Sequence, residues 1–220
     1  MSEASNGSKK RNRLSKDIWL KHTLSKIGEV GVAGIQIETL AKELNVTKGS
    51  FYWHFQDRET LLYETLSYWY ISATKAIGLA GKRDFDDPLD RLRYFFTLAL
   101  NRRHDVPGGS VERALQEWAR VSEIAAETTR RVDQDRISLI ADAYIELGKS
   151  EHQALQTATM ALAQIIGLNI LSRSQSKRNH AQDTKAFLAV FLPATVGQEL
   201  PKKDSNNTTG TTEVTASTAG

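Results

Sequence analysis

Residues 47–55, with the sequence TKGSFYWHF, constrain the fold more than any other stretch of the chain. Phe51 and Phe55 are four residues apart, so a helix would place both rings on one side, where they can be buried. The other positions are small, polar or basic and would face outward: Lys48, Gly49, Ser50 and Tyr52. Thr47 can cap the helix with its hydroxyl, and the free N–H groups of the first turn would favour a phosphate. The segment therefore predicts a short helix that contacts DNA.

Two further helices are expected before this segment. Ser15 can cap a helix over residues 15–30, and Gln36 opens a second helix whose apolar residues recur at helical spacing. A tight turn at residues 45–46 would then lead into the third helix. A helix, a short turn and a helix, preceded by a supporting helix, form the arrangement of a helix-turn-helix domain.

The rest of the sequence also predicts helices. Asp57 can cap a long helix that ends near residue 80, and a charged loop would follow over residues 81–87. Further helices are expected at 88–103, 111–121, 122–147, 151–172 and 180–192. Since no alternating strand pattern and no internal repeat is present, the predicted fold class is all-α.

The predicted domain organisation has four parts. A three-helix domain at residues 14–60 is followed by a larger helical domain at residues 61–197. The polar ends have almost nothing to bury, so we expect a disordered basic arm at residues 1–13 and a disordered tail at residues 198–220.

Composition excludes several classes of protein. The hydrophobic content of 40% and the charged content of 25% are ordinary for a globular chain, and the net charge is +3. Basic residues crowd the sequence just ahead of the predicted DNA-contacting helices: Lys9, Lys10, Arg11, Arg13 and Lys16. The absence of cysteine excludes disulfides, thiolate metal sites and cysteine nucleophiles. The N-terminus lacks the apolar core of a signal peptide, so we expect a cytoplasmic protein.

One uncharged run, residues 153–172, is long enough to raise the question of a transmembrane helix. Its polar residues would be costly in lipid: Gln153, Gln156, Gln164 and Asn169. A buried helix of a soluble protein is the preferred interpretation. Together with residues 180–192, this stretch is apolar enough to form a helix-on-helix homodimer interface.

No residue pattern indicates an active site, a metal centre or a cofactor site. The histidines are scattered and lack paired carboxylates at metal-ligand spacing: His22, His104, His152 and His180. Asp133 and Asp135 precede Arg136 on a helix, which favours a charged face or an internal ion pair over an acid/base pair. Ser110 has no nucleophile-elbow context. We therefore expect a protein that is not an enzyme.

Residues 40–55 (LAKELNVTKGSFYWHF) and 57–62 (DRETLL) resemble the signature of the tetracycline-repressor (TetR-like) family of transcriptional regulators. The resemblance covers roughly residues 14–66, and a looser similarity continues to Trp118 and to residues 132–136 and 147–150. It implies an all-helical homodimer with an N-terminal DNA-binding domain of three helices. It also implies a larger C-terminal domain that binds a small molecule and forms the dimer. The fourth helix would join the two domains and transmit the ligand signal.

The resemblance also implies which side chains meet DNA. Base contacts would come from Lys48, Gly49 and Ser50, and phosphate contacts from Gln36, Thr47, Tyr52, His54 and Arg58. Trp53 is expected to pack within the protein. Three positions depart from the family pattern: Gln36 stands where Thr is common, Glu38 where Arg is frequent, and Arg58 where Lys is usual. Glu38 removes a favourable phosphate contact, while Arg58 keeps the charge and adds a fork suited to phosphate.

The sequence of the larger helical domain, residues 61–197, says less about which residues bind a ligand. Its candidate effector-pocket residues are Phe96, Asn101, Trp118 and Gln164. The aromatic side chains could line a cavity or simply fill a core, and the core is the more frequent outcome. The amides are informative because a buried amide needs a hydrogen-bond partner.

Two functions remain open at this point. The first is a ligand-responsive transcriptional regulator, acting as a repressor, that binds a pseudo-palindromic operator as a homodimer and is released by a small-molecule effector. The second is a helical binding module that no longer needs DNA and would dimerise and take up a ligand without preferring any DNA sequence.

Overall fold

The computed structural model describes residues 14–100, 109–174 and 180–193. The expected basic arm at residues 1–13, the tail at residues 198–220 and the candidate pocket residue Asn101 lie outside the described residues. Within the described ranges the chain forms helices and no strand, which confirms the all-α prediction.

The first four helices form one end of the molecule: α1 (Lys16–Val30), α2 (Ile37–Glu43), α3 (Lys48–Tyr52) and α4 (Arg58–Tyr70). Asp57 caps α4 as expected, because its carboxylate accepts a hydrogen bond of 2.7 Å from the Thr60 N–H. At the start of α3 the expected hydroxyl cap is wrong. The Thr47 side chain makes no capping bond, and the first turn closes instead through the Thr47 carbonyl, which accepts from the Ser50 N–H at 2.9 Å.

Helix α3 is shorter than expected, since it spans five residues and not nine. Trp53 and His54 form a turn after it. The Phe55 N–H nevertheless donates to the Phe51 carbonyl at 3.0 Å, so Phe55 lies one turn beyond Phe51. Both rings are buried, with 0% and 2% of their surface exposed, as their spacing predicted.

Helix α4 continues without a break through a π-helical turn, η1 (Ile71–Lys75), into α5 (Ala76–Asp84), and together they form one rod. The loop expected from residue 81 therefore begins later, after Asp84. The reason lies at Gly81, where a Cβ atom would come within 2.5 Å of the Phe95 ring. Glycine here lets α5 pack closely on the next helix, and the helix extends through it.

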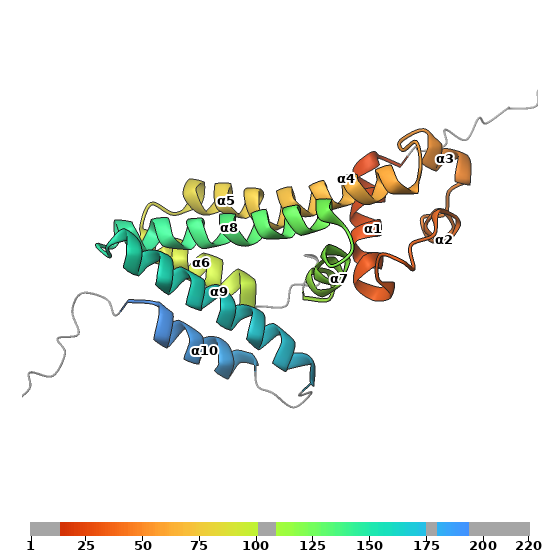
Figure 1. The fold of residues 1–220 in the computed structure, drawn as a ribbon. Coiled ribbons are helices and arrows are strands. Elements are labelled where there is room, and N and C mark those ends of the chain that lie inside the picture. The colour runs from red at the N-terminus through yellow and green to blue at the C-terminus, as the bar shows by residue number, and fades with distance from the viewer. Residues whose placement is uncertain (1–13, 101–108, 175–179, 194–220) are drawn as a thin grey trace, which may run out of the picture.

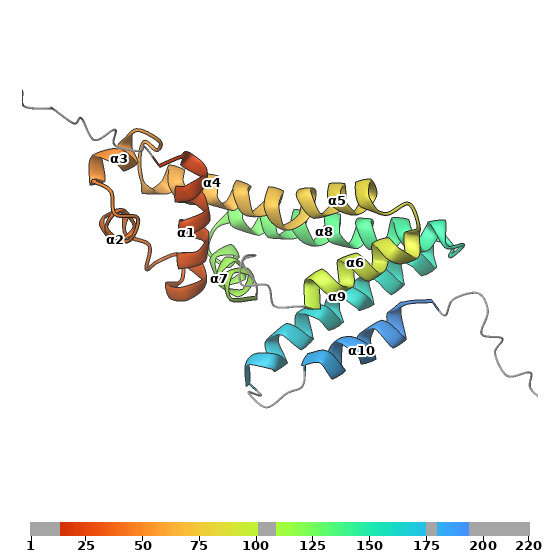
Figure 2. The ribbon, with the colours of Figure 1, turned by 180° about the vertical axis from the view of Figure 1, so that it is seen from behind.

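Five more helices complete the fold: α6 (Pro88–Leu100), α7 (Gly109–Ala119), α8 (Glu123–Glu146), α9 (Glu151–Ser174) and α10 (His180–Phe191). Helix α8 runs alongside the α4–η1–α5 rod, and α9 returns beside α8 (Figure 1). Helix α6 packs against α8, α9 and α10, as the view from behind shows (Figure 2). Helices α3 and α10 thus lie at opposite ends of the molecule (Figure 1).

Two apolar cores hold these helices together. The first joins α1–α4 to α7 and to the first half of α8, and it includes Trp19, Phe51, Leu61, Leu115 and Val132. The second lies among α6, the second half of α8, α9 and α10, and it includes Phe96, Ile140, Tyr144, Ala158 and Phe187. The first core extends well beyond residue 60, and α8 contributes to both cores. The expected division into domains at residues 60–61 stays a prediction.

Helix α9 is buried along one side only. Its Ala154, Ala158 and Ala161 are fully buried, whereas Leu155 and Ile170 are 52% and 64% exposed. By length and composition, Glu151–Leu171 could cross a membrane, and 28% of its most apolar window is buried. The expectation of a buried helix therefore holds for one face, and the other face is apolar and uncovered in the single chain.

Candidate DNA-binding surface

The turn between α2 and α3 is built by backbone hydrogen bonds. The Val46 N–H donates to the Ala41 carbonyl at 2.9 Å, and the Asn45 N–H donates to the Lys42 carbonyl at 3.1 Å. Asn45 adopts a positive φ of 55°, a conformation that asparagine tolerates better than most residues with side chains. The chain therefore reverses within three residues and sets α3 against α2, as a helix-turn-helix requires.

Aromatic packing fixes the orientation of α3. The Phe51 ring meets the Trp19 ring edge-on, with centroids 5.6 Å apart, and stacks on the Phe55 ring at 5.3 Å. Trp19 belongs to α1 and is fully buried. The inner side of α3 is thus anchored to the supporting helix, and its other side must face outward.

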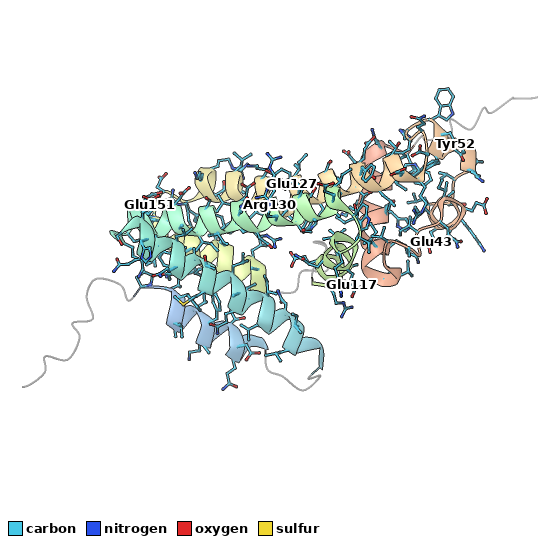
Figure 3. All side chains as sticks on the ribbon, viewed as in Figure 1. Glu43, Tyr52, Glu117, Glu127, Arg130 and Glu151 are labelled. Carbon is cyan, nitrogen blue, oxygen red and sulfur yellow. The ribbon has the colours of Figure 1, made fainter. Side chains whose placement is uncertain are left out.

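The outer side of α3 lies at the end of the molecule away from α9 and α10, where Figure 3 shows Tyr52. Lys48 and Gly49 are exposed, and Tyr52 is 54% exposed. Trp53 is 72% exposed, so the expectation that it packs within the protein is wrong. Trp53 lies in the turn that follows α3 and is not part of the core that includes Phe51 and Phe55. Sequence reasoning missed this residue because an aromatic cluster usually indicates a core.

Gly49 has no structural reason to be glycine. Its φ is negative, and a Cβ atom added there would meet only the Thr47 hydroxyl oxygen, at an ordinary contact distance of 3.7 Å. At Gly28, by contrast, a Cβ would lie 2.8 Å from Val111, and at Gly78 it would lie 2.8 Å from Leu139. At those two positions a larger residue would force neighbouring side chains to move. Nothing among the described residues requires glycine at position 49.

Lys48 is paired with an acidic residue across the turn. Its Nζ donates to Glu38 Oε1 at 2.8 Å, and both side chains are exposed. This hydrogen bond lowers the pKa of Glu38 and raises the pKa of Lys48, so both groups stay charged at neutral pH. The pair lies where α2 and α3 meet. Its partners are ten residues apart, and no sequence pattern predicts that they meet.

Two of the expected phosphate contacts are engaged inside the protein. Arg58 Nε donates to the Ile35 carbonyl at 2.8 Å, and Arg58 Nη2 donates to the Val32 carbonyl at 2.6 Å. The fork thus ties α4 to the loop before α2. His54 Nε2 lies 2.9 Å from the Leu14 carbonyl oxygen, so the tautomer that carries its proton on Nε2 donates to it. Whether either residue also touches DNA stays a prediction.

The remaining expected phosphate contacts, Gln36 and Thr47, are both exposed at the starts of α2 and α3. Gln36 Oε1 accepts a long hydrogen bond of 3.4 Å from the Thr39 hydroxyl, and neither side chain caps its helix. Ser50 is half-buried one turn into α3. Thr47 and Ser50 flank Lys48 and Gly49 along the chain, and Gln36 lies at the start of the neighbouring helix α2.

The candidate pocket residues are not brought together. Phe96 is fully buried in the second core, with its ring 5.0 Å from that of Phe187. Trp118 packs against the first core, where its ring stacks on Tyr63 with centroids 6.3 Å apart. Gln164 is exposed on α9, so the expectation of a buried amide there is wrong. The location of an effector pocket therefore stays a prediction. Within the described ranges, no group of three or more acidic and histidine side chains could hold a metal ion.

The two ends of the molecule are linked at the π-helical turn. The Tyr70 hydroxyl donates to Asp135 Oδ2 at 2.7 Å, and Lys75 Nζ lies 3.1 Å from the same oxygen. The hydrogen bond from Tyr70, followed by that from Lys75, lowers the pKa of Asp135. A polar clamp thus fastens the α4–η1–α5 rod to α8.

Sequence comparison identifies the helix-turn-helix. Residues 20–65 match the model of a family described as bacterial regulatory proteins of the tetR family. The matched segment contains most of α1, all of α2 and α3, and the first part of α4. These residues are therefore similar to the corresponding segment of bacterial regulatory proteins of the tetR family. No curated protein matches the chain in sequence.

Several solved structures share the fold of this chain. A putative regulator from Rhodococcus sp. superposes with a TM-score of 0.62 at 22% identity, over 81% of this chain and 98% of that one. The reduced form of E. coli NemR gives 0.65 at 20% identity, over 81% and 97%. AibR, solved in complex with isovaleryl coenzyme A and operator DNA, gives 0.55 at 16% identity, over 81% and 98%.

Proposed function

We propose that this protein is a cytoplasmic, ligand-responsive repressor of the tetR family that binds a pseudo-palindromic operator as a homodimer and is released by a small-molecule effector. The observation that carries the proposal is the outer side of α3. There an exposed glycine with no internal reason to be glycine stands beside a lysine, above a pair of buried phenylalanines. Such a surface suits close approach of a nucleic acid backbone and base edges.

Within this proposal the DNA contacts divide by side-chain chemistry. Lys48, Gly49 and Ser50 face base edges, because they lie at the exposed start of α3. Phosphates are contacted by Gln36, Thr47, Tyr52, His54 and Arg58, which surround that start. Arg58 uses two of its five N–H donors in the two backbone hydrogen bonds, so the two N–H groups of Nη1 and the second one of Nη2 remain for a phosphate.

The homodimer is proposed to form through α9 and α10. Both helices leave large apolar side chains uncovered, among them Leu155, Met160 and Ile170 on α9 and Val190 on α10. An exposed apolar face of this kind indicates a protein partner. A second copy that covers it would place two copies of α3 on one side of the dimer, as a two-half-site operator requires.

The effector is proposed to bind in the larger helical half, with Phe96, Asn101, Trp118 and Gln164 as its candidate contacts. AibR, which shares the fold, was solved with both an acyl coenzyme A and operator DNA. The α4–η1–α5 rod runs from the DNA-binding end into this half and is clamped to α8 at Asp135. A ligand that favours one position of the rod would change the separation of the two α3 helices, typically with about 1–3 kcal/mol of coupling.

The proposal is tested by DNA selection with the full-length protein. Duplexes with a randomised centre are enriched on the wild-type protein, and binding to the enriched sequence is measured at several salt concentrations. We expect a palindromic sequence, a dimer in analytical ultracentrifugation, and an affinity that falls steeply with salt. Enrichment of no sequence, with a normal dimer, would replace the regulator with a helical binding module.

Matched lysine variants test whether α3 is the helix that contacts DNA. Lys48→Ala should weaken binding to the enriched sequence by roughly 5- to 150-fold if the lysine contacts a base. Lys82→Ala is the control, because Lys82 is an exposed, ion-paired lysine on α5, far from α3. Equal losses for both variants would remove α3 from the proposal. A loss that is the same on every DNA sequence would make Lys48 a phosphate contact.

A further inference from the structure

Glu38 places a negative charge on the surface that is proposed to meet DNA. Helices α2 and α3 carry two acidic residues, Glu38 and Glu43. Glu43 turns toward α1, where His22 Nε2 lies 2.8 Å and Lys26 Nζ 2.7 Å from its two carboxylate oxygens. Glu38 instead turns toward α3 and bonds to Lys48, with 76% of its side chain exposed. Its place on the DNA-facing side is therefore not explained by the packing of α2 on α1.

Stability does not explain the pair either. Exposed ion pairs contribute little to folding, because water and salt screen them and both side chains lose freedom. Next to DNA, a carboxylate is also repelled by the phosphates and weakens binding to any sequence. A group that costs general affinity and adds little stability is useful only if it improves discrimination between sequences.

The hydrogen-bonding groups of the pair match the major-groove edges of a guanine and a neighbouring cytosine. A lysine ammonium donates to guanine O6 and N7, while a carboxylate accepts from the amino group of cytosine. Lys48 has three N–H donors and donates one hydrogen bond to Glu38 Oε1, so two donors remain for a base. Glu38 Oε2 makes no hydrogen bond with another described residue and can accept one. The pair thus offers donors and an acceptor side by side.

We propose that Glu38 is a specificity-determining residue, which holds Lys48 over a guanine and accepts a hydrogen bond from the amino group of a neighbouring cytosine. This inference rests on the proposed DNA-binding function. The hydrogen bond to Glu38 also keeps the Lys48 ammonium away from phosphates. A phosphate that approached Lys48 would come close to the Glu38 carboxylate, and the two negative charges would repel each other. Glu38 therefore lowers affinity for random DNA and raises the preference for the operator.

The test compares three full-length proteins in the same DNA selection: the wild type, Glu38→Gln and Glu38→Ala. The amide of glutamine can pair with adenine N6 and N7. Glu38→Gln should therefore change the preferred base at one position from cytosine to adenine, and Glu38→Ala should lose the preference there. Both variants should bind random duplex DNA several-fold more tightly, with a salt dependence steeper by about one ion.

The control is Glu29→Gln on α1. Glu29 is also an exposed glutamate paired with a lysine, since Lys26 Nζ lies 3.1 Å from its Oε2, but it is not part of α2 or α3. The Glu29→Gln substitution removes one negative charge from the same end of the molecule, as Glu38→Gln does. A gain in random binding that is equal in Glu29→Gln and Glu38→Gln, with unchanged base preferences, would overturn the inference.

A double variant separates positioning from net charge. In a Lys48→Ala background, Glu38→Gln should no longer alter the preference at the guanine, because the residue that it positions is gone. An undiminished effect there would contradict the positioning role. The DNA selection with the wild-type protein distinguishes a failure of the role proposed for Glu38 from a failure of the proposed function. If the wild type enriches an operator and the Glu38 variants enrich the same one, only the role of Glu38 fails, whereas enrichment of no sequence by the wild type defeats the proposed function as well.

Discussion

The two ends of this molecule bury similar aromatic clusters but expose opposite chemistry. At the α3 end, Phe51 and Phe55 pack on Trp19 beneath a surface of lysine, glycine and tyrosine. At the α10 end, Phe96 packs on Phe187 while the outer sides of α9 and α10 expose leucine, isoleucine and valine. A polar, basic surface suits a nucleic acid, and an apolar one suits another protein. The α3 end is therefore the one that we propose binds DNA, and the α10 end the one that we propose binds a second copy of the chain.

The largest effect should come from truncating the aromatic anchor at either end. Phe51 and Phe96 are both fully buried, so changing either to alanine leaves a cavity and should cost about 3–5 kcal/mol of unfolding free energy. Urea unfolding followed by circular dichroism measures the loss. Phe51→Ala should abolish DNA binding, because the orientation of α3 depends on that ring. A Phe51→Ala protein that kept its full stability would remove the ring from the anchor.

The tryptophans make this test specific to one end. Trp19 and Trp69 are buried in the first core, and Trp118 packs against it. Tryptophan fluorescence therefore reports unfolding of the DNA-binding end, and circular dichroism reports the whole chain. Because α8 contributes to both cores, we expect the two signals to change together in the wild type. Separate transitions would show that the ends are independent domains.

The next largest effect should come from Arg58. Arg58→Ala removes two hydrogen bonds to the Val32 and Ile35 carbonyls and should cost about 1–3 kcal/mol of unfolding free energy. Arg58→Lys is the informative second variant, since an ammonium cannot reproduce the planar fork. Urea unfolding and the salt dependence of DNA binding are measured for both. If Arg58→Ala left the free energy of unfolding unchanged and lowered the salt dependence of DNA binding by about one ion, Arg58 would be a phosphate contact, and its hydrogen bonds to the Val32 and Ile35 carbonyls would not stabilise the fold.

A smaller effect is expected where the two ends are clamped together. Tyr70→Phe removes the hydroxyl that bonds to Asp135 and should cost about 0.5–1.5 kcal/mol. The folded-state pKa of Asp135 lies below its ordinary value, so its contribution is present above the unfolded pKa of about 3.9 and is lost as pH falls through the folded pKa. The difference between wild type and variant should therefore be constant near neutral pH and shrink below about pH 4. Urea unfolding between neutral and acidic pH checks this, and a difference independent of pH would mean that the hydroxyl acts without Asp135.

The sequence predicted what depends on near neighbours. The burial of Phe51 and Phe55 followed from their spacing along one helix, and the cap at Asp57 followed from its place before Arg58 and Glu59. Both are confirmed. These features need only a few residues of local structure, so helical periodicity and capping rules can find them, although the capping rule failed at Thr47.

What the sequence could not predict depends on contacts between distant segments. Arg58 reaches carbonyls 23 and 26 residues away, and Tyr70 meets Asp135 across 65 residues. Lys48 meets Glu38 only because the turn folds α3 back on α2. At the other end, apolar periodicity cannot separate a pocket from a core or an interface: Phe96 lies in the second core, Trp118 packs against the first, and Gln164 is exposed on α9.

The smallest effect on stability should come from Gly49→Ala, and it gives the sharpest test of the comparison. A Cβ atom fits at position 49, and alanine is a better helix former than glycine, so the change should leave stability unaltered or raise it by up to about 1 kcal/mol. Operator binding should nevertheless fall, because the methyl group would stand between α3 and the DNA. Gly81→Ala is the matched control: its Cβ would strike the Phe95 ring, so it should lose about 1–3 kcal/mol of stability and leave the DNA contacts intact. Normal operator binding by Gly49→Ala would show that nothing approaches this glycine closely, and the DNA-reading surface would then have to lie elsewhere on α2 and α3.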